Sequence, residues 1–163
     1  MKRLRSPAIG AVTLAGMALL TVERPYAGEF DHPVKCTLET LKGQYLVAGN
    51  GMLIPPVPLF QIPAGAPPSV TAAAAYSIYN GDGTGTDWVT FTVDGTVAIG
   101  AVPTPTPTTY TLNSDCTGTK TVLPSGPHFN IFVAIDGSGL TAVATDQGFA
   151  VSESDRRVGA DYQ

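Results

Sequence analysis

The sequence predicts an all-β protein, an antiparallel up-and-down barrel of about eight or nine strands that follows a cleaved signal peptide. Short segments alternate apolar and polar residues with the period of two typical of half-buried strands. Turn motifs rich in Gly, Asp, Asn and Pro separate them, and no helical period is long enough to predict a long helix. Tightly connected antiparallel strands hide their edges by closing into a barrel. A β-sandwich is the alternative, disfavoured because long crossovers are not evident after residue 70.

The N-terminus has the order of charge and apolar residues that is typical of an export signal. Lys2, Arg3 and Arg5 precede a run without charge over residues 8–22. This run suits a signal-peptide core and is short for a membrane helix. We expect cleavage after Ala27 and therefore a secreted or periplasmic protein. An uncleaved N-terminal anchor is the competing interpretation.

The predicted mature chain is acidic. Five basic and twelve acidic residues follow residue 27, which is a net charge of about −7. Nucleic acids and anionic membrane surfaces are bound by clustered Lys and Arg, so this balance argues against both partners. No later segment is expected to span a bilayer as a helix.

The predicted mature chain divides into a lead-in segment at 28–42, a barrel domain at 43–152 and a flexible polar tail at 153–163. Within the lead-in, Thr37 to Lys42 is expected to form one helical turn, with Thr37 as its cap and Thr40 in place of the usual Glu. The tail is expected to fray because it is short, terminal and polar.

The first predicted strand, residues 44–50, leads into an unusual loop at 51–69. Six prolines exclude a central strand or a helix there. The loop is also apolar, so we expect it to cover an apolar surface, either the mouth of its own barrel as a lid or a partner protein. The large apolar residues of this lid loop are Met52, Leu53, Ile54, Val57, Leu59, Phe60 and Ile62.

Alternation and tight turns dominate the rest of the chain. Strands are predicted at 70–79 and 86–93, and Asp94-Gly95 is a strong hairpin turn into a strand at 96–102. Further strands are predicted at 109–112, 119–123, 128–135, 140–145 and 149–152. The clearest stripe of apolar residues, expected to face the core, is Phe129, Ile131, Val133 and Ile135.

The two cysteines are predicted to form a structural disulfide in the exported protein. Cys36 and Cys116 are far apart in sequence, and closing such a loop is worth about 4.5 kcal/mol in the chain-entropy model. A redox pair would need the C-x-x-C spacing, which this chain lacks.

Residues 80–87 (NGDGTGTD) resemble the acidic, glycine-rich loops that hold calcium. Asp82 and Asp87 are the weak cation-ligand candidates. Phe91 occupies the position where an EF-hand loop has its bidentate Glu, so a hairpin turn is the preferred interpretation. No metal and no cofactor are expected.

Five aromatic residues on predicted strands are the candidates to line a ligand pocket if the barrel is hollow. They are Tyr45, Tyr76, Trp88, Tyr110 and Phe132. The run Ala72 to Ala75 indicates either a hollow interior, because small side chains leave space, or close packing beneath the apolar loop. No catalytic residue is assigned, since no nucleophile elbow surrounds any Ser. His128 is expected to be an exposed histidine at a strand end.

Several motifs resemble those of a group of small exported bacterial proteins of uncharacterised function. The motifs are LKGQY (41–45), NGDGTG (80–85), TYTLNSDCTG (109–118), F-x-IFVAIDG (129–137) and TDQG (145–148). The resemblance covers residues 36–152 and implies a calycin-like barrel, similar to lipocalins or the allene-oxide-cyclase type. The chain departs from true lipocalins, because Gly43-Gln44-Tyr45 replaces their G-x-W start, and it inserts the proline-rich loop.

The leading functional hypothesis is an exported, non-enzymatic barrel that binds a small apolar ligand or a protein partner. A cofactor-free barrel enzyme of the cyclase or isomerase kind is the second hypothesis. A structural envelope or surface protein with a filled core is the third. An interior cavity above about 300 Å³ would favour the first two over the third.

Overall fold

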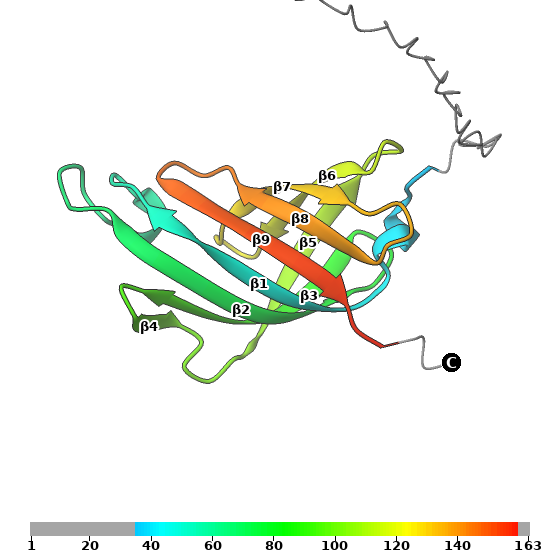
Figure 1. The fold of residues 1–163 in the computed structure, drawn as a ribbon, viewed down its shortest axis with the longest axis horizontal. Coiled ribbons are helices and arrows are strands. Elements are labelled where there is room, and N and C mark those ends of the chain that lie inside the picture. Colours follow the sequence, from blue (N-terminus) through cyan, green and yellow to red (C-terminus); the bar gives the residue numbers. More distant parts are fainter. Residues whose placement is uncertain (1–34, 160–163) are drawn as a thin grey trace, which may run out of the picture. The chain divides into compact units, whose positions relative to one another are not determined.

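The computed structural model describes residues 35–159. The predicted signal peptide, residues 28–34 of the predicted lead-in and the last four residues lie outside the described residues. The described chain folds into one sheet of nine antiparallel strands (Figure 1). The strands are β1 (Gly43–Leu53), β2 (Ser69–Tyr79), β3 (Thr84–Val93), β4 (Thr96–Ile99), β5 (Pro105–Leu112), β6 (Thr117–Val122), β7 (His128–Val133), β8 (Gly139–Ala144) and β9 (Phe149–Arg157).

Eight of these strands close into a barrel. From β5 to β9 each strand pairs with the next along the chain, and β9 pairs with β1. The ring continues from β1 to β2, to β3 and on to β5. β4 pairs only with β3 and is the extra strand. The predicted antiparallel barrel is therefore confirmed, and the β-sandwich alternative is wrong.

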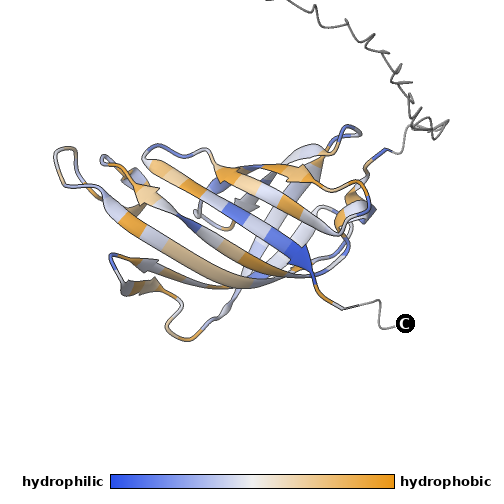
Figure 2. Ribbon diagram, viewed as in Figure 1, coloured by the Kyte–Doolittle hydropathy of each residue, from blue (hydrophilic) through white to orange (hydrophobic). Residues whose placement is uncertain are grey.

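Alternation along each strand decides what lies inside the barrel. In β7, buried Phe129, Ile131 and Val133 alternate with exposed His128, Asn130 and Phe132. Figure 2 shows hydrophobic and hydrophilic bands succeeding one another along the strands. The Asp94-Gly95 turn between β3 and β4 has positive φ at both residues (48° and 76°), as a tight hairpin requires.

Ile135 does not belong to the core stripe, contrary to the prediction. β7 ends at Val133, and Ile135 is about half exposed in the following turn. That turn is closed by hydrogen bonds from Ala134 N to Gly139 O and from Gly137 N to Ala134 O. Because the backbone leaves the extended conformation, the period of two ends there.

β5 begins at Pro105, before its predicted start at residue 109, and two strands extend past their predicted C-terminal ends. β1 continues to Leu53, into the predicted loop, and β9 continues to Arg157, into the predicted flexible tail. β9 pairs with β1 on one side and β8 on the other over most of its length. These non-local pairings order residues 153–157, so the prediction of a frayed tail is wrong for that stretch.

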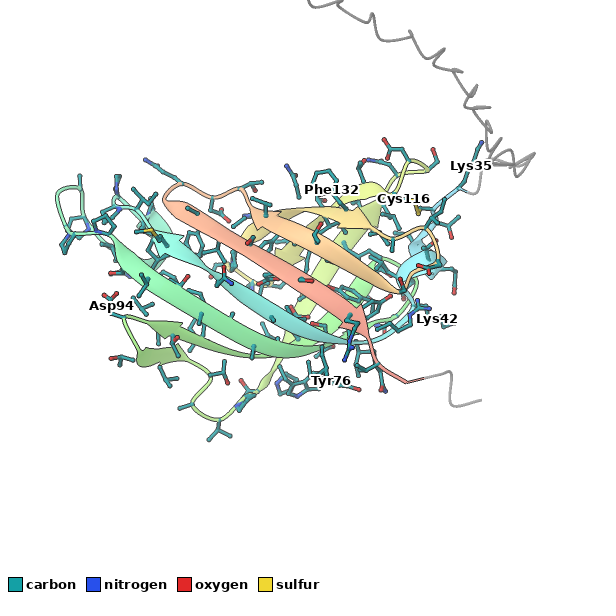
Figure 3. The ribbon with its side chains drawn as sticks, viewed as in Figure 1. Lys35, Lys42, Tyr76, Asp94, Cys116 and Phe132 are labelled. Carbon is teal, nitrogen blue, oxygen red and sulfur yellow. A yellow bond between two sulfur atoms is a disulfide. The ribbon has the colours of Figure 1, made fainter. Side chains whose placement is uncertain are left out.

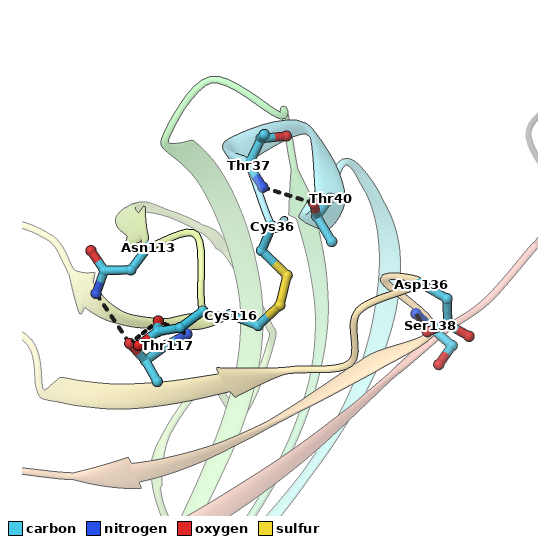
Figure 4. Close-up of a disulfide and its surroundings, with 9 residues drawn as sticks. Cys36, Thr37, Thr40, Asn113, Cys116, Thr117, Asp136 and Ser138 are labelled. Atoms are coloured by element: carbon cyan, nitrogen blue, oxygen red, sulfur yellow. Dashed lines mark hydrogen bonds between the residues drawn. A yellow bond between two sulfur atoms is a disulfide. The ribbon is translucent and has the colours of Figure 1, made fainter. Parts of the chain in front are cut away.

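The lead-in is attached to the barrel by the predicted disulfide. Cys36 and Cys116 are bonded across 80 positions of sequence (Figure 4). Cys36 N also donates to Ser114 O. The short 3₁₀ helix η1 (Leu38–Leu41) follows, and the Thr37 amide before it donates to Thr40 Oγ1 at 3.0 Å. Leu41 is completely buried, so this segment covers one end of the barrel.

Three connections use the same Asp-x-Thr/Ser turn. The carboxylates of Asp82, Asp115 and Asp136 accept hydrogen bonds from the backbone amides of Thr84, Thr117 and Ser138 at 2.9–3.0 Å. Hydrogen bonds from the same Thr and Ser residues lower the pKa of each Asp below its usual value.

Within the described residues, no helix is long and apolar enough to cross a membrane.

Candidate functional site

The barrel interior contains a cavity of about 350 Å³. The reason for the space lies in β1 and β2, where small residues point inward. Gly49 is paired with Ala73, and Val47 with Ala75. Val47, Ala73 and Ala75 line the cavity, and further apolar side chains from the strands line it too: Val89, Phe91, Ile99, Val122, Phe129, Phe149 and Val151.

The lid loop covers one side of this cavity. Its 3₁₀ helix η2 (Pro58–Phe60) brings Leu59 and Phe60 to the cavity wall. The ring of Phe60 stacks on Phe91 and Phe149, with centroids 5.7 and 5.5 Å apart. The opposite rim is the connection between β6 and β7, residues 123–127.

A short backbone bridge holds η2 in place. The amides of Val57 and Ile62 donate to each other's carbonyl oxygens, and Val57 is completely buried. Ile62 is partly buried against the core, as are Leu59 and Phe60.

The remaining lid-loop residues have different places. Leu53 is completely buried in the core as the last residue of β1, whereas Met52 and Ile54 are exposed. The predicted lid therefore consists of residues 57–62, and Met52 and Ile54 do not contribute to it.

The polar part of the cavity wall begins with a buried ion pair. Asp87 of β3 and Lys120 of β6 both line the cavity, and Lys120 Nζ lies 2.8 Å from Asp87 Oδ2. Asp87 is only 5% exposed and Lys120 only 3% exposed. The Lys120 ammonium also lies 5.6 Å from the ring centroid of Tyr79 and 6.0 Å from that of Phe129.

Two acidic residues of β9 lie in the same region. Glu153 lines the cavity, and Asp155 is buried, with its Oδ2 accepting a hydrogen bond from the Tyr79 hydroxyl at 3.0 Å. Burial raises the pKa of Glu153 to about 7, partly offset by Lys120. Burial likewise raises the pKa of Asp155. Burial alone would lower the pKa of Lys120, but Tyr79 and then the carboxyl groups of Asp87, Glu153 and Asp155 hold it above its usual value.

Several buried polar atoms of this layer have no hydrogen-bond partner among the described residues. They are Ser77 Oγ, Asp87 Oδ1, Thr108 Oγ1 and Asp155 Oδ1. Buried oxygens without partners are rare in folded proteins. Of these four residues, Asp87 lines the cavity, so a donor group of a bound molecule can reach its Oδ1 there.

The predicted pocket aromatics do not line this cavity. Tyr45 and Tyr110 are inside the barrel, but they pack with Tyr79 near η1 instead of at the cavity. Tyr45 donates its hydroxyl to Gly137 O, and Tyr110 donates to Leu38 O.

The other three aromatics lie on the outer surface. Tyr76 and Trp88 are cross-strand partners on the outer face, with ring centroids 5.8 Å apart. Figure 3 shows Tyr76 pointing away from the barrel. Phe132 is 54% exposed and lines a separate hollow of about 300 Å³ with polar residues of β5 and β6. Aromatic character alone indicated these residues, although their strand positions have outward parity.

The weak cation candidates are not brought together. Asp82 is in the exposed turn described above, whereas Asp87 is inside the barrel on Lys120. The described chain contains no cluster of three or more His, Cys, Asp and Glu residues that could hold a metal. His128 is exposed at the start of β7 and pairs with Asp146 at 2.9 Å, in agreement with its prediction as a strand-end histidine.

The polar residues of the cavity were missed at the sequence level. From the sequence, Asp87 is predicted only as a weak cation ligand, Lys120 is one of the five basic residues after residue 27, and Glu153 and Asp155 lie in the predicted tail. A signal was present, because Asp87 and Lys120 have the same parity as the apolar inward positions of their own strands. A charged residue at such a position predicts a polar interior.

Comparisons with protein-family models, with curated proteins and with solved structures found no match for this chain. The barrel architecture stands on the structure alone, and the calycin-like resemblance stays a prediction.

Proposed function

We propose that this protein is an exported binding protein that holds a small, largely apolar molecule inside its barrel. The observation that supports this most is the 350 Å³ cavity, with apolar walls and a few convergent polar groups, which is the usual character of a small-molecule site. A barrel with a filled core would not leave this space. Export is supported by the disulfide and by the charge pattern of the N-terminus.

The cavity wall offers a direct test through a matched pair of variants. Ala75 faces the cavity, and its neighbour Ala74 is exposed on the outer face of the same strand. Ala75→Phe fills the space, whereas Ala74→Phe adds the same ring outside. Titration with the uncharged apolar dye N-phenyl-1-naphthylamine should show binding to the wild type and to Ala74→Phe. We expect Ala75→Phe to lower the dye affinity at least tenfold, because the new ring occupies the space in which the dye would bury its own aromatic surface.

Two results would contradict the proposal: no dye binding by the wild type, or equal binding by both variants when circular dichroism shows both folded. If the dye results support the proposal, native mass spectrometry of the protein purified from its own source would identify the bound molecule directly.

Acid–base catalysis on a bound apolar substrate is the second candidate function. It is favoured by Glu153, because a carboxyl group with its pKa near 7 beside an apolar cavity can give and take protons at neutral pH. A molecule recovered chemically changed from the wild type, but unchanged from Glu153→Gln, would support this function over simple binding.

A further inference from the structure

We infer that the cavity selects apolar molecules that carry one cationic amino group, bound between the carboxylates of Glu153 and Asp87; this inference rests on the proposed function and specifies its ligand. Three observations carry it: the interior charge balance, the free acceptors at the cavity wall, and the shielding of the one lysine there.

The charge balance of the interior is acidic. Asp87, Glu153 and Lys120 line the cavity, and the buried Asp155 is outside this lining but acts on the charge of both Glu153 and Lys120. Arg157 of β9 does not neutralise these carboxyl groups. Its guanidinium donates instead to Thr40 O, Lys42 O and Tyr45 Oη. Three carboxyl groups therefore share one ammonium, and a buried carboxylate without a counter-charge is unfavourable.

Acceptor atoms are available where a ligand would lie. Asp87 is 5% exposed and lines the cavity, its Oδ2 is used by Lys120, and its Oδ1 has no partner among the described residues. Glu153 also lines the cavity, and within the described chain no hydrogen bond or ion pair engages its carboxylate. An ammonium group has three donors and no acceptor, which suits two acceptor groups at one wall.

Lys120 is poorly placed to bind an anionic ligand instead. Its ammonium contacts Asp87 directly and is flanked by the rings of Tyr79 and Phe129. An incoming carboxylate would have to compete with Asp87 and approach Glu153, which is a repulsive arrangement.

The backbone opposite Glu153 makes room for its side chain. Gly49 of β1 is paired with Glu153, and a Cβ at Gly49 would lie 3.1 Å from Glu153 Cγ. A larger residue there would displace the carboxylate from its present position. The glycine thus keeps the acidic group beside the small residues that form the cavity.

The charge of this site depends on pH near neutrality. The groups that act on Glu153 are Lys120 of β6, Asp155 of β9 and Asp87 of β3, and burial raises the pKa of Glu153 to about 7. Above that pH Glu153 is anionic and attracts an ammonium, and below it the attraction is lost. Amine binding should therefore strengthen as pH rises through 7, while binding of an uncharged analogue should not change.

The test uses three ligands with the same eight-carbon chain: octylamine, 1-octanol and octanoate, each displacing N-phenyl-1-naphthylamine from the intact protein. At pH 8 we expect octylamine to bind roughly tenfold or more tighter than octanol, as for a hydrogen bond to a charged group. Octanoate should bind more weakly than octanol. Glu153→Gln should abolish the amine preference and leave octanol binding intact, whereas Glu39→Gln, an exposed glutamate on η1, should change neither.

The wild type alone provides a second measurement. Lowering the pH from 8 to 5.5 should reduce the preference for octylamine over octanol about tenfold, since octylamine stays charged and Glu153 does not. Equal binding of octylamine and octanol at pH 8 would overturn the inference and leave the proposed function standing. Preferential binding of octanoate would also overturn it and assign the anchor to Lys120. Failure of both dye and octanol to bind would instead refute the proposed function itself.

Discussion

The two ends of the barrel interior are built differently. Near η1, the rings of Tyr45, Tyr79 and Tyr110 meet edge to face with centroids 5.2 and 5.3 Å apart, and Leu41 closes the space. Near η2, Gly49, Ala73 and Ala75 replace large side chains, and a cavity remains. The same barrel therefore concentrates its packing at one end and leaves the other hollow.

The packed end is also where residues 36–42 are joined to the barrel. Arg157 joins Thr40, Lys42 and Tyr45 through its guanidinium, and the disulfide attaches the lead-in to the turn before β6. Between the two ends lies the charged layer of Asp87, Lys120 and Asp155. We therefore expect stability to reside mainly near η1, and the η2 end to carry a less stable, hollow site.

The largest expected effect comes from the disulfide at the packed end. Replacing Cys36 and Cys116 together by Ser should lower the free energy of unfolding by about 4.5 kcal/mol, because the loop that the bond closes spans 80 positions. Urea unfolding followed by circular dichroism measures this. Dye binding in the absence of denaturant should change little, and a loss of binding as large as the loss of stability would show that the two ends are not independent.

The charged layer should respond nearly as strongly. Lys120→Met leaves the buried Asp87 carboxylate without its counter-charge and should destabilise the fold by about 3–5 kcal/mol. The double variant Lys120→Met with Asp87→Leu should recover most of that loss, because the unpaired charge is gone. If the double variant unfolds as easily as the single one, the ion pair is not the reason for the destabilisation.

A matched pair of valines compares the two ends directly. Val133 is buried near Cys116, whose carbonyl accepts its amide, whereas Val151 lines the cavity. Val133→Ala should cost about 2 kcal/mol of unfolding free energy, and Val151→Ala about 1 kcal/mol or less, because its side chain already borders empty space. Equal losses in urea unfolding would contradict the contrast between packed and hollow ends.

The last expected effect is opposite in sign, a gain in stability at the hollow end, and it depends on pH. Burial raises the pKa of Glu153 to about 7 in the folded protein from the usual 4.5. The folded state thus binds more protons than the unfolded state between these values, so stability falls as pH rises through this window. Glu153→Gln should be more stable than the wild type at pH 8, by on the order of 1–3 kcal/mol, and equal to it near pH 4. Thermal unfolding at both pH values tests this, and a wild type more stable than the variant at pH 8 would show that Glu153 is paired.

Much of the fold follows from local patterns. Features that depend on a few neighbouring residues can be predicted from the sequence. They include the alternation in residues 129–133, the Asp94-Gly95 hairpin and the turn at 80–85. The end of β9 was not predictable in this way. The polar stretch from Glu153 to Arg157 is ordered by pairing with β1, more than a hundred positions earlier in the chain.

The site shows the same division more sharply. A run of four alanines indicated space, but alternation sends Ala73 and Ala75 into the cavity and Ala72 and Ala74 to the outer surface. Neighbouring residues and composition are enough to predict the strands, the turns, the disulfide and the acidic character. Only the closed barrel decided which face of each strand is the inside. Closure is what places Asp87, Lys120 and Glu153 from three different strands around one cavity.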